Sequence, residues 1–309
     1  MPTLNQLRSL VVLAETLHFH RAAERRHVSQ PALSNQIAQL EQALGVPLVE
    51  RTRRRVLLTP VGREVAERAK VILRDVEDLK EVTRQARAPL SGTLRLGVLP
   101  TLGPYLLPHI LPGLRRRFPD LRLYLREEPA GRLLPELAHG ELDLVLAAPQ
   151  STPEGLVAQP LFAEPFWVAL PLGHALAERP ALAVGDLAGE RLLTMDQGHC
   201  LRDQALELCR RAGAAEHPDF RATSLDSLRQ MVATGVAPTL LPGLYVRAEA
   251  LADTEIVMRP FAPPAPHRTI SLLWRRSGTR AADYRLFAQL VQDGLPDAVS
   301  APGTPLHEA

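Results

Sequence analysis

Two cysteines lie close together in the second half of the chain, Cys200 and Cys209, and the 309 residues contain no others. A pair is too few for a disulfide scaffold or for a four-ligand zinc site. His199 precedes Cys200, but a metal site made of these three side chains would lack a fourth ligand and a compact spacing. Two alternatives stay open: cysteines that pack as small buried side chains, which is the commoner case, or thiol redox chemistry.

The residues around Cys200 predict a reactive sulfur. Asp196-Gln197-Gly198 is typical of a turn, so that Cys200 falls in the first turn of the following helix. The positive end of a helix dipole lowers the pKa of a thiol, and the thiolate is the nucleophile. Arg202 would lower the pKa further and Asp203 would oppose it. A thiolate that attacks a peroxide becomes a sulfenic acid, which a second thiol can trap as a disulfide.

The elements that must position this segment alternate in type. The expected order is a strand at 93–99, a helix at 105–118, a strand at 121–125, a helix at 133–139 and a strand at 142–147. Such a βαβαβ order predicts a parallel sheet with helices on both faces. The pattern restarts near 166–171, continues to about 242, and ends in a helix at 284–295.

The N-terminal part of the chain has a different organisation. Apolar spacing predicts helices at 4–17 and 20–26, and Ser29 is a good N-cap for a third helix that ends at Gly45. A short helix, a turn and a capped helix form a helix-turn-helix. Residues 48–59 then predict a hairpin with a basic tip, as in a winged helix-turn-helix.

Polar and basic side chains gather where such a motif meets DNA. The predicted DNA-binding residues are Arg21, Ser29, Gln30, Pro31, Ser34, Asn35, Gln39, Arg51, Arg53, Arg54 and Arg55. Gln and Asn can bond base edges, and arginines suit phosphates or the minor groove, although each residue alone could be an ordinary solvated one. Residues 1–63 contain nine arginines against four acids, a charge of +5, whereas the whole chain carries +2. Only this N-terminal segment, which we call the head, is therefore expected to bind a polyanion.

A long helix is predicted to follow Thr59-Pro60 and to run to about residue 87. Its apolar seam consists of Val61, Val65, Ala69, Ile72, Val76, Leu79 and Val82. The length of the seam and its charged flanks favour pairing with a second chain over packing on the helix's own domain. Residues 88–92 break the helix and are interpreted as a hinge.

Several stretches of the head resemble the LysR-type transcriptional regulator family. They are 18–24, 27–34, 40–48 and Leu58-Thr59-Pro60-Val61-Gly62, in one gapless run. The resemblance implies an N-terminal all-α winged helix-turn-helix with a long linker helix, and a C-terminal α/β, two-lobed, periplasmic-binding-protein-like regulatory domain. The implied boundaries are 1–59 for DNA binding, 60–88 for the linker and dimerisation helix, 89–92 for the hinge, 93–297 for the regulatory domain (lobe I about 93–163 and 268–297, lobe II about 164–267) and 298–309 for a disordered tail.

A narrower resemblance concerns the hydrogen-peroxide-sensing branch of that family. It is carried by 198–205 with Cys209, and by 99–109, 220–225 and 267–270. It implies that Cys200 reacts with peroxide and that Cys209 resolves the product as a disulfide, with Thr101, His199 and Arg268 around the reactive sulfur. One departure is visible, because Ala130 stands where that branch commonly has a threonine that helps to hold peroxide.

The spacing of the two cysteines then predicts a conformational change. Nine residues of continuous helix mean a rise of about 13.5 Å and a rotation of about 900°, to the opposite face. A disulfide needs Cα atoms within about 7 Å. The two thiols can therefore join only if the helix between them unwinds or refolds.

We accordingly expect a transcriptional regulator and not an enzyme, because no phosphate loop or Gly-x-Gly-x-x-Gly follows a predicted strand. The expected partners are double-stranded DNA, hydrogen peroxide, further copies of the chain in a dimer or tetramer, and RNA polymerase, with no cofactor or metal. The chain has no secretory signal and no run of about 20 apolar residues, so we expect it in the cytoplasm and not in a membrane. The alternative is a LysR-type regulator that binds a metabolite in the interlobe cleft near Thr101 and Ser224, without thiol chemistry.

Overall fold

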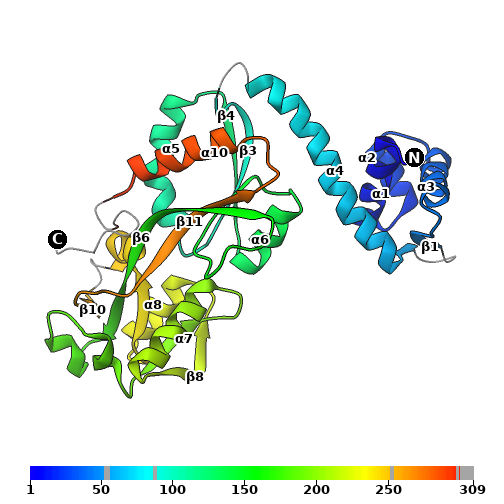
Figure 1. Cartoon of the computed structure of the whole chain (residues 1–309). Coiled ribbons are helices and arrows are strands. Elements are labelled where there is room, and N and C mark those ends of the chain that lie inside the picture. The colour runs from blue at the N-terminus through cyan, green and yellow to red at the C-terminus, as the bar shows by residue number, and fades with distance from the viewer. Residues whose placement is uncertain (52–55, 86–88, 251–253, 297–298, 300–309) are drawn as a thin grey trace. The chain divides into compact units, whose positions relative to one another are not determined.

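The computed structural model describes residues 1–51, 56–85, 89–250, 254–296 and 299. The chain divides into two compact units, Met1–Ala88 and Pro89–Ala309, which are considered separately (Figure 1). The arginines predicted for the hairpin tip, Arg53 to Arg55, and most of the predicted tail at 298–309 lie outside the described residues.

The first unit begins with three short helices, α1 (Leu4–Thr16), α2 (Phe19–Arg26) and α3 (Gln30–Leu44). They enclose a core of side chains without solvent exposure, among them Leu10, Leu33 and Ile37. As predicted, the Ser29 hydroxyl accepts a hydrogen bond from the Ala32 backbone at 3.3 Å and caps α3. The helix ends at Gly45, whose φ of 74° is the left-handed conformation that favours glycine.

A two-stranded hairpin follows, β1 (Val49–Arg51) and β2 (Val56–Leu58), paired antiparallel. Glu41 on α3 holds its start, because one carboxylate oxygen accepts from the backbone N–H groups of Leu48 at 2.8 Å and Val49 at 3.1 Å. The predicted wing of the helix-turn-helix is therefore present and is tied to the helix before it.

The long helix α4 (Pro60–Gln85) begins where predicted, with the Thr59 hydroxyl accepting from Gly62 N at 2.8 Å. A Cβ atom at Gly62 would lie 2.0 Å from the Leu48 carbonyl oxygen, so only glycine allows this approach. The predicted seam divides into two parts. Ala69 is buried in the core of its own unit, whereas Val61 and Ile72 are each 45% exposed. Side chains beyond residue 76 in this helix lie outside the description.

Among the described residues, the second unit contains nine strands. These are β3 (Gly92–Val98), β4 (Leu121–Glu127), β5 (Leu144–Ala147), β6 (Leu156–Pro171), β7 (Arg191–Met195), β8 (Ala215–Ala222), β9 (Thr239–Pro242), β10 (Ile256–Pro260) and β11 (His267–Arg275). The order is β4-β3-β5-β11-β6-β9-β7-β8, with β10 on the side of β6.

The parallel pairing predicted from the βαβαβ order at 93–147 is confirmed, and the long strands that this prediction did not cover make the sheet mixed. β3 pairs parallel with β4 and β5, and β7 parallel with β8 and β9. β6 and β11 instead pair antiparallel with each other and with their other neighbours. β6 has 16 residues, enough to run through two lobes, and β11 returns antiparallel along it after the chain has passed through the elements from β7 to β10. The sheet is mixed for this reason.

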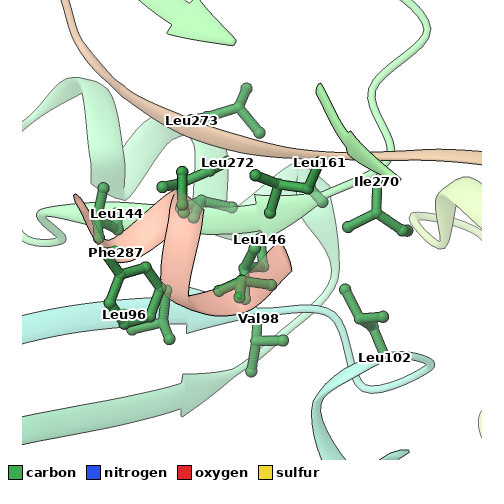
Figure 2. Packing of buried hydrophobic residues seen from close by; sticks show 14 of the residues in the cluster. Leu96, Val98, Leu102, Leu144, Leu146, Leu161, Ile270, Leu272, Leu273 and Phe287 are labelled. Carbon is green, nitrogen blue, oxygen red and sulfur yellow. The ribbon is translucent and has the colours of Figure 1, made fainter. Parts of the chain in front are cut away.

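Two apolar cores flank these long strands. The first lies between β3, β5, β11 and the helices α5 (Gly103–Arg117), α6 (Ala130–Ala138) and α10 (Ala281–Asp293). Figure 2 shows its centre, where Leu96, Leu146, Leu272 and Phe287 converge. Along β3, Leu94, Leu96 and Val98 point into this core at every second position, whereas all four residues of β5 are buried.

The second core lies under α7 (Cys200–Ala212) and α8 (Leu225–Ala233) and includes Cys209. The remaining short elements are 3₁₀ helices at Ala175–Glu178 and Val184–Leu187, α9 (Gly243–Tyr245) and a π-helical segment at Val246–Ala250. Tyr105 of α5 packs against both cores and stacks edge-on against Tyr245 with ring centroids 5.1 Å apart. The two lobes therefore share an aromatic contact as well as two strands.

Candidate functional site

Cys200 is the first residue of α7, as the turn at 196–198 predicts. Its N-cap is His199, whose backbone is extended and whose side chain makes no capping hydrogen bond. Although most of α7 packs into the second core, Cys200 packs against the first. The reactive candidate therefore lies where one lobe meets the other.

The surroundings of Cys200 come from the carboxyl ends of three parallel strands. Thr101 follows β3, Ala148 follows β5, and Pro129 and Ala130 follow β4. The turn before Cys200 lies against this last loop, since a Cβ atom on Gly198 would be 4.0 Å from that of Pro129. Ligands of α/β proteins bind at this edge of a sheet.

Arg268, at the start of β11, joins Thr101 to a carboxylate that the sequence analysis did not single out. Its Nη1 donates to Thr101 Oγ1 at 2.9 Å, its Nη2 to the Thr101 carbonyl at 2.8 Å, and its Nε to Glu164 Oε2 at 2.8 Å. Glu164 also accepts from Leu244 N at 2.9 Å. The three side chains are at most 3% exposed. A lone acid in the apolar run Leu161-Phe162-Ala163-Glu164 was the signal that could have revealed it.

The pKa of the Cys200 thiol is raised, contrary to the expectation from the helix dipole. The cause is burial, which removes water from the charged form. The Arg268 guanidinium and the Ala148 backbone act in the lowering direction, and Asp203 raises the pKa as expected. The Arg202 side chain, expected to help, instead bonds to Glu216 on β8. Arg268 is therefore the cation that favours the thiolate form of Cys200.

His199 does not supply a second cation. Burial lowers its pKa below the ordinary value, and nearby Asp196 only partly opposes this. The ring is therefore neutral at neutral pH and can act as a hydrogen-bond donor or acceptor. His199 adjoins Cys200 in the chain, and its side chain is partly exposed.

Gln204 is a second residue that the sequence analysis missed. It lies one turn after Cys200 on α7, and its Nε2 donates to the Ala148 carbonyl at 3.3 Å. Its Oε1 is buried and accepts no hydrogen bond from the described residues. An unpaired buried oxygen beside a thiol is an acceptor for a small polar molecule. The helical spacing of four from Cys200 was the available signal.

Cys209 lies on the same unbroken helix and is 3% exposed. Both cysteines are free thiols. Burial and the nearby Glu216 carboxylate raise the pKa of Cys209. The continuous helix predicted between the two cysteines is confirmed. Nine residues of such a helix place the two sulfurs on opposite faces, with a rise of about 13.5 Å. No disulfide can form in this conformation.

The predicted DNA-binding residues line the start of α3 and its neighbours. Gln30, Pro31, Asn35 and Arg21 are exposed, and Ser34 is partly buried. Gln39 is exposed but its Oε1 accepts from Gln6 Nε2 at 3.3 Å, so one acceptor is used within the head. Arg51 ends β1, and its side chain lies outside the description.

Comparison with known families covers both units. A model described as a bacterial regulatory helix-turn-helix protein of the lysR family matches residues 4–63, and one described as the LysR substrate binding domain matches residues 87–296. The chain belongs to the LysR family.

Among curated LysR-family proteins, the chain is 46% identical over 292 residues to the hydrogen peroxide-inducible genes activator of Dickeya chrysanthemi, covering 94% of this chain and 95% of that protein. Among solved structures, it resembles a full-length cysteine-to-aspartate variant of OxyR from Pseudomonas aeruginosa, with a TM-score of 0.76, 36% identity and coverage of 94% and 98%. A hydrogen-peroxide-bound cysteine-to-serine variant of OxyR from Corynebacterium glutamicum matches with a TM-score of 0.68 and 34% identity, covering 96% and 94%.

Two further observations on this LysR-family chain concern metal binding and membrane-spanning helices. Within the described residues, His, Cys, Asp and Glu side chains form no group of three or more that could hold a metal ion. None of the helices described is long and apolar enough to cross a membrane.

Proposed function

We propose that this LysR-family protein is a DNA-binding transcriptional regulator that senses hydrogen peroxide through oxidation of Cys200. The main support is the position of that thiol, beside the buried Arg268–Thr101 pair and on the same helix as a second thiol. The relatives described above include a hydrogen peroxide-inducible activator and a peroxide-bound OxyR. The reaction occurs once per activation, so the protein acts as a sensor and not as an enzyme.

In the first step the Cys200 thiolate attacks one oxygen of peroxide. An S–O bond forms, the O–O bond breaks, and the departing oxygen takes a proton and leaves as water. Thr101 Oγ1 accepts from Arg268, so its own proton remains for donation to the departing oxygen. Arg268 stabilises the negative charge that moves from sulfur to oxygen. Gln204 Oε1 can accept a hydrogen bond from the bound peroxide, and neutral His199 adds a polar group at the site.

In the second step Cys209 attacks the sulfenic sulfur of Cys200. The S–S bond forms and the hydroxyl leaves with the thiol proton as water. Because α7 separates the two sulfurs, this step requires the helix to unwind between them. The disulfide then holds a second conformation of the regulatory domain.

Ala130 modifies this chemistry. It begins α6, beside the turn that carries Cys200, and offers a methyl group where the peroxide-sensing branch commonly has a hydroxyl. Without that hydroxyl, peroxide is held by one fewer hydrogen bond. We therefore propose that this protein reacts more slowly than relatives that have threonine there.

The head transmits the change to DNA as part of an oligomer. We propose that α3 enters the major groove with Gln30, Ser34 and Asn35 near the bases. The exposed Val61 and Ile72 on α4 suit pairing with a second copy, giving a dimer that assembles into a tetramer. The oxidised form would change how the heads hold DNA and how RNA polymerase is recruited, in the cytoplasm.

The test compares wild-type protein with Cys200→Ser and Cys209→Ser variants. Genomic fragments that the reduced protein retains would be footprinted and transcribed with and without hydrogen peroxide. We expect a peroxide-dependent change in the wild type that both variants lose while still binding DNA. A regulator that used the cleft near Thr101 and Ser224 for a metabolite would show no peroxide response, and both variants would behave like the wild type.

A further inference from the structure

We propose that Glu216 is a positioning residue for the disulfide-forming step: it anchors Arg202 of α7 to β8, keeps the helix intact, and so delays the union of Cys200 with Cys209. This inference rests on the proposed function, since it concerns the second of its two steps. It adds a residue that controls the rate at which the disulfide forms.

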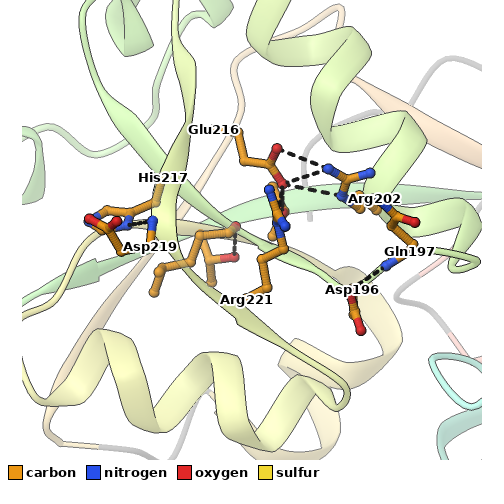
Figure 3. A network of polar contacts seen from close by, with 10 residues as sticks. Asp196, Gln197, Arg202, Glu216, His217, Asp219 and Arg221 are labelled. Carbon is orange, nitrogen blue, oxygen red and sulfur yellow. Dashed lines mark hydrogen bonds and ion pairs between the residues drawn. The ribbon is translucent and has the colours of Figure 1, made fainter.

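Glu216 is the centre of a polar cluster between α7 and the sheet (Figure 3). Its carboxylate accepts from Arg202 Nε at 3.1 Å and from Arg202 Nη2 at 3.0 and 2.9 Å. It also accepts from Thr194 Oγ1 on β7 at 2.5 Å and from Arg221 Nε on β8 at 3.3 Å. One carboxylate thus connects the helix to two strands.

The cluster is largely shielded from water. The side chains of Arg202 and Glu216 are 15% and 19% exposed, against 42% for Arg221. Burial alone would raise the pKa of Glu216, but the hydrogen bonds from Thr194, Arg202 and Arg221 lower it below its ordinary value. The carboxylate is therefore charged at neutral pH, and a shielded ion pair with several hydrogen bonds is stronger than an exposed one.

The position of the anchor on the helix links it to both thiols. Arg202 is two residues after Cys200, a rotation of about 200°, and seven before Cys209, a rotation that returns to within about 20° of the same face. Arg202 and Cys209 therefore share the face opposite Cys200. The influence of Glu216 on the pKa of Cys209 agrees with this placement, because it requires the carboxylate to lie near that thiol.

This arrangement opposes disulfide formation. When Cys209 moves toward Cys200, the helix must unwind between them, and Arg202 lies inside the segment that moves. The bonds from Arg202 to Glu216 are present in the helical form and are stretched or lost in the unwound one. They stabilise the dithiol form and leave the attack of Cys200 on peroxide unaffected, since Arg202 does not face that thiol.

The test measures the two steps separately in full-length protein. Reduced wild type and Glu216→Gln would be mixed with hydrogen peroxide and quenched over time, with dimedone trapping Cys200 sulfenic acid and peptide mapping quantifying the Cys200–Cys209 disulfide. For Glu216→Gln we expect an unchanged first step and a second step about tenfold faster, equivalent to about 1.4 kcal/mol. In dithiothreitol buffers its midpoint potential would be about 30 mV more negative, which is tenfold in the equilibrium constant.

Two further variants sharpen the result. Glu207→Gln removes a carboxylate from the same helix, but Glu207 pairs with Arg210 within α7 and anchors nothing to the sheet. It should match the wild type in both steps. Thr194→Val keeps every charge and removes one hydrogen bond to Glu216, so we expect a second step a few-fold faster; it also serves if Glu216→Gln does not fold.

An unchanged second step and potential in both Glu216→Gln and Thr194→Val would overturn the inference, as would equal acceleration in Glu207→Gln. The potential is measured without peroxide. Absence of a sulfenic acid in the wild type would therefore contradict the proposed function alone, while the potentials would still decide the role of Glu216.

Discussion

Arg268 and Glu164 form an ion pair in which neither side chain reaches solvent, with Nε and Oε2 2.8 Å apart. The pair crosses between the long strands β11 and β6, where the register shifts nearby. It directs the other two nitrogens of the guanidinium at Thr101. The charge that faces the Cys200 thiol is therefore held in place by a carboxylate on the next strand.

Removing one partner of this pair should be costly. Arg268→Met leaves the buried Glu164 carboxylate without its ion-pair partner, and we expect it to lower the free energy of unfolding by about 3–5 kcal/mol. The double variant Arg268→Met with Glu164→Gln should recover much of that loss. Urea unfolding followed by circular dichroism measures both. If the single variant and the wild type had equal free energies of unfolding, the loss of the Arg268 partner would carry no cost for the buried Glu164.

The hydroxyl of Thr101 should matter for rate more than for folding. Thr101→Val retains the shape of the side chain and the carbonyl contact to Arg268, but removes the proton donor. We expect the second-order rate constant with hydrogen peroxide to fall by about 10²-fold, as for other lost transition-state donors. Thr239→Val is the matched control, since this buried hydroxyl bonds to Leu193 in the other core. A loss of rate in both variants would argue against a role specific to Thr101.

The raised pKa of Cys200 predicts a pH dependence. Burial favours the neutral thiol, so the reactive thiolate is a small fraction at neutral pH. Below the pKa that fraction, and with it the rate of oxidation, should rise about tenfold for each pH unit. Stopped-flow rates between pH 6 and about 9 should therefore increase without a plateau. A plateau below pH 8 would mean that Arg268 and the helix N-terminus outweigh burial, contrary to this account.

Substitutions in the N-terminal head should distinguish residues that contact base edges from residues that contact phosphates. Asn35 is exposed on α3, and Asn35→Ala should weaken binding to a selected site by about 1–3 kcal/mol while nonspecific binding is unchanged. Arg21→Ala should weaken both kinds of binding and reduce the salt slope by about 1. Fluorescence anisotropy at several salt concentrations measures these effects. Identical losses on specific and random DNA for Asn35→Ala would place that residue on the phosphates.

Local rules predicted the parts of the fold that depend on neighbouring residues. Ser29 and Thr59 cap helices because a hydroxyl at that spacing reaches a free backbone N–H, and Gly45 adopts the conformation that ends one. The start of α7 at Cys200 follows from the turn before it. These features need no knowledge of distant contacts.

What the sequence could not predict depends on long-range contacts. The direction of β11 beside β5 and β6 is set by residues more than a hundred positions away, and the local pattern could not reveal it. The pKa of Cys200 was predicted in the wrong direction because burial is a tertiary property. The roles of Glu164 and Gln204 depend on hydrogen-bond partners that are distant in the sequence, Arg268 for the first and Ala148 for the second.

Peptide mapping of the two thiols shows whether hydrogen peroxide joins Cys200 to Cys209. Reduced protein would receive near-stoichiometric hydrogen peroxide, be alkylated, and be digested without reductant. We expect a crosslink between the peptides of Cys200 and Cys209, which would require α7 to unwind between them. Two alkylated thiols after prolonged exposure would show that peroxide does not oxidise this pair, and would leave a DNA-binding regulator whose signal is something other than peroxide.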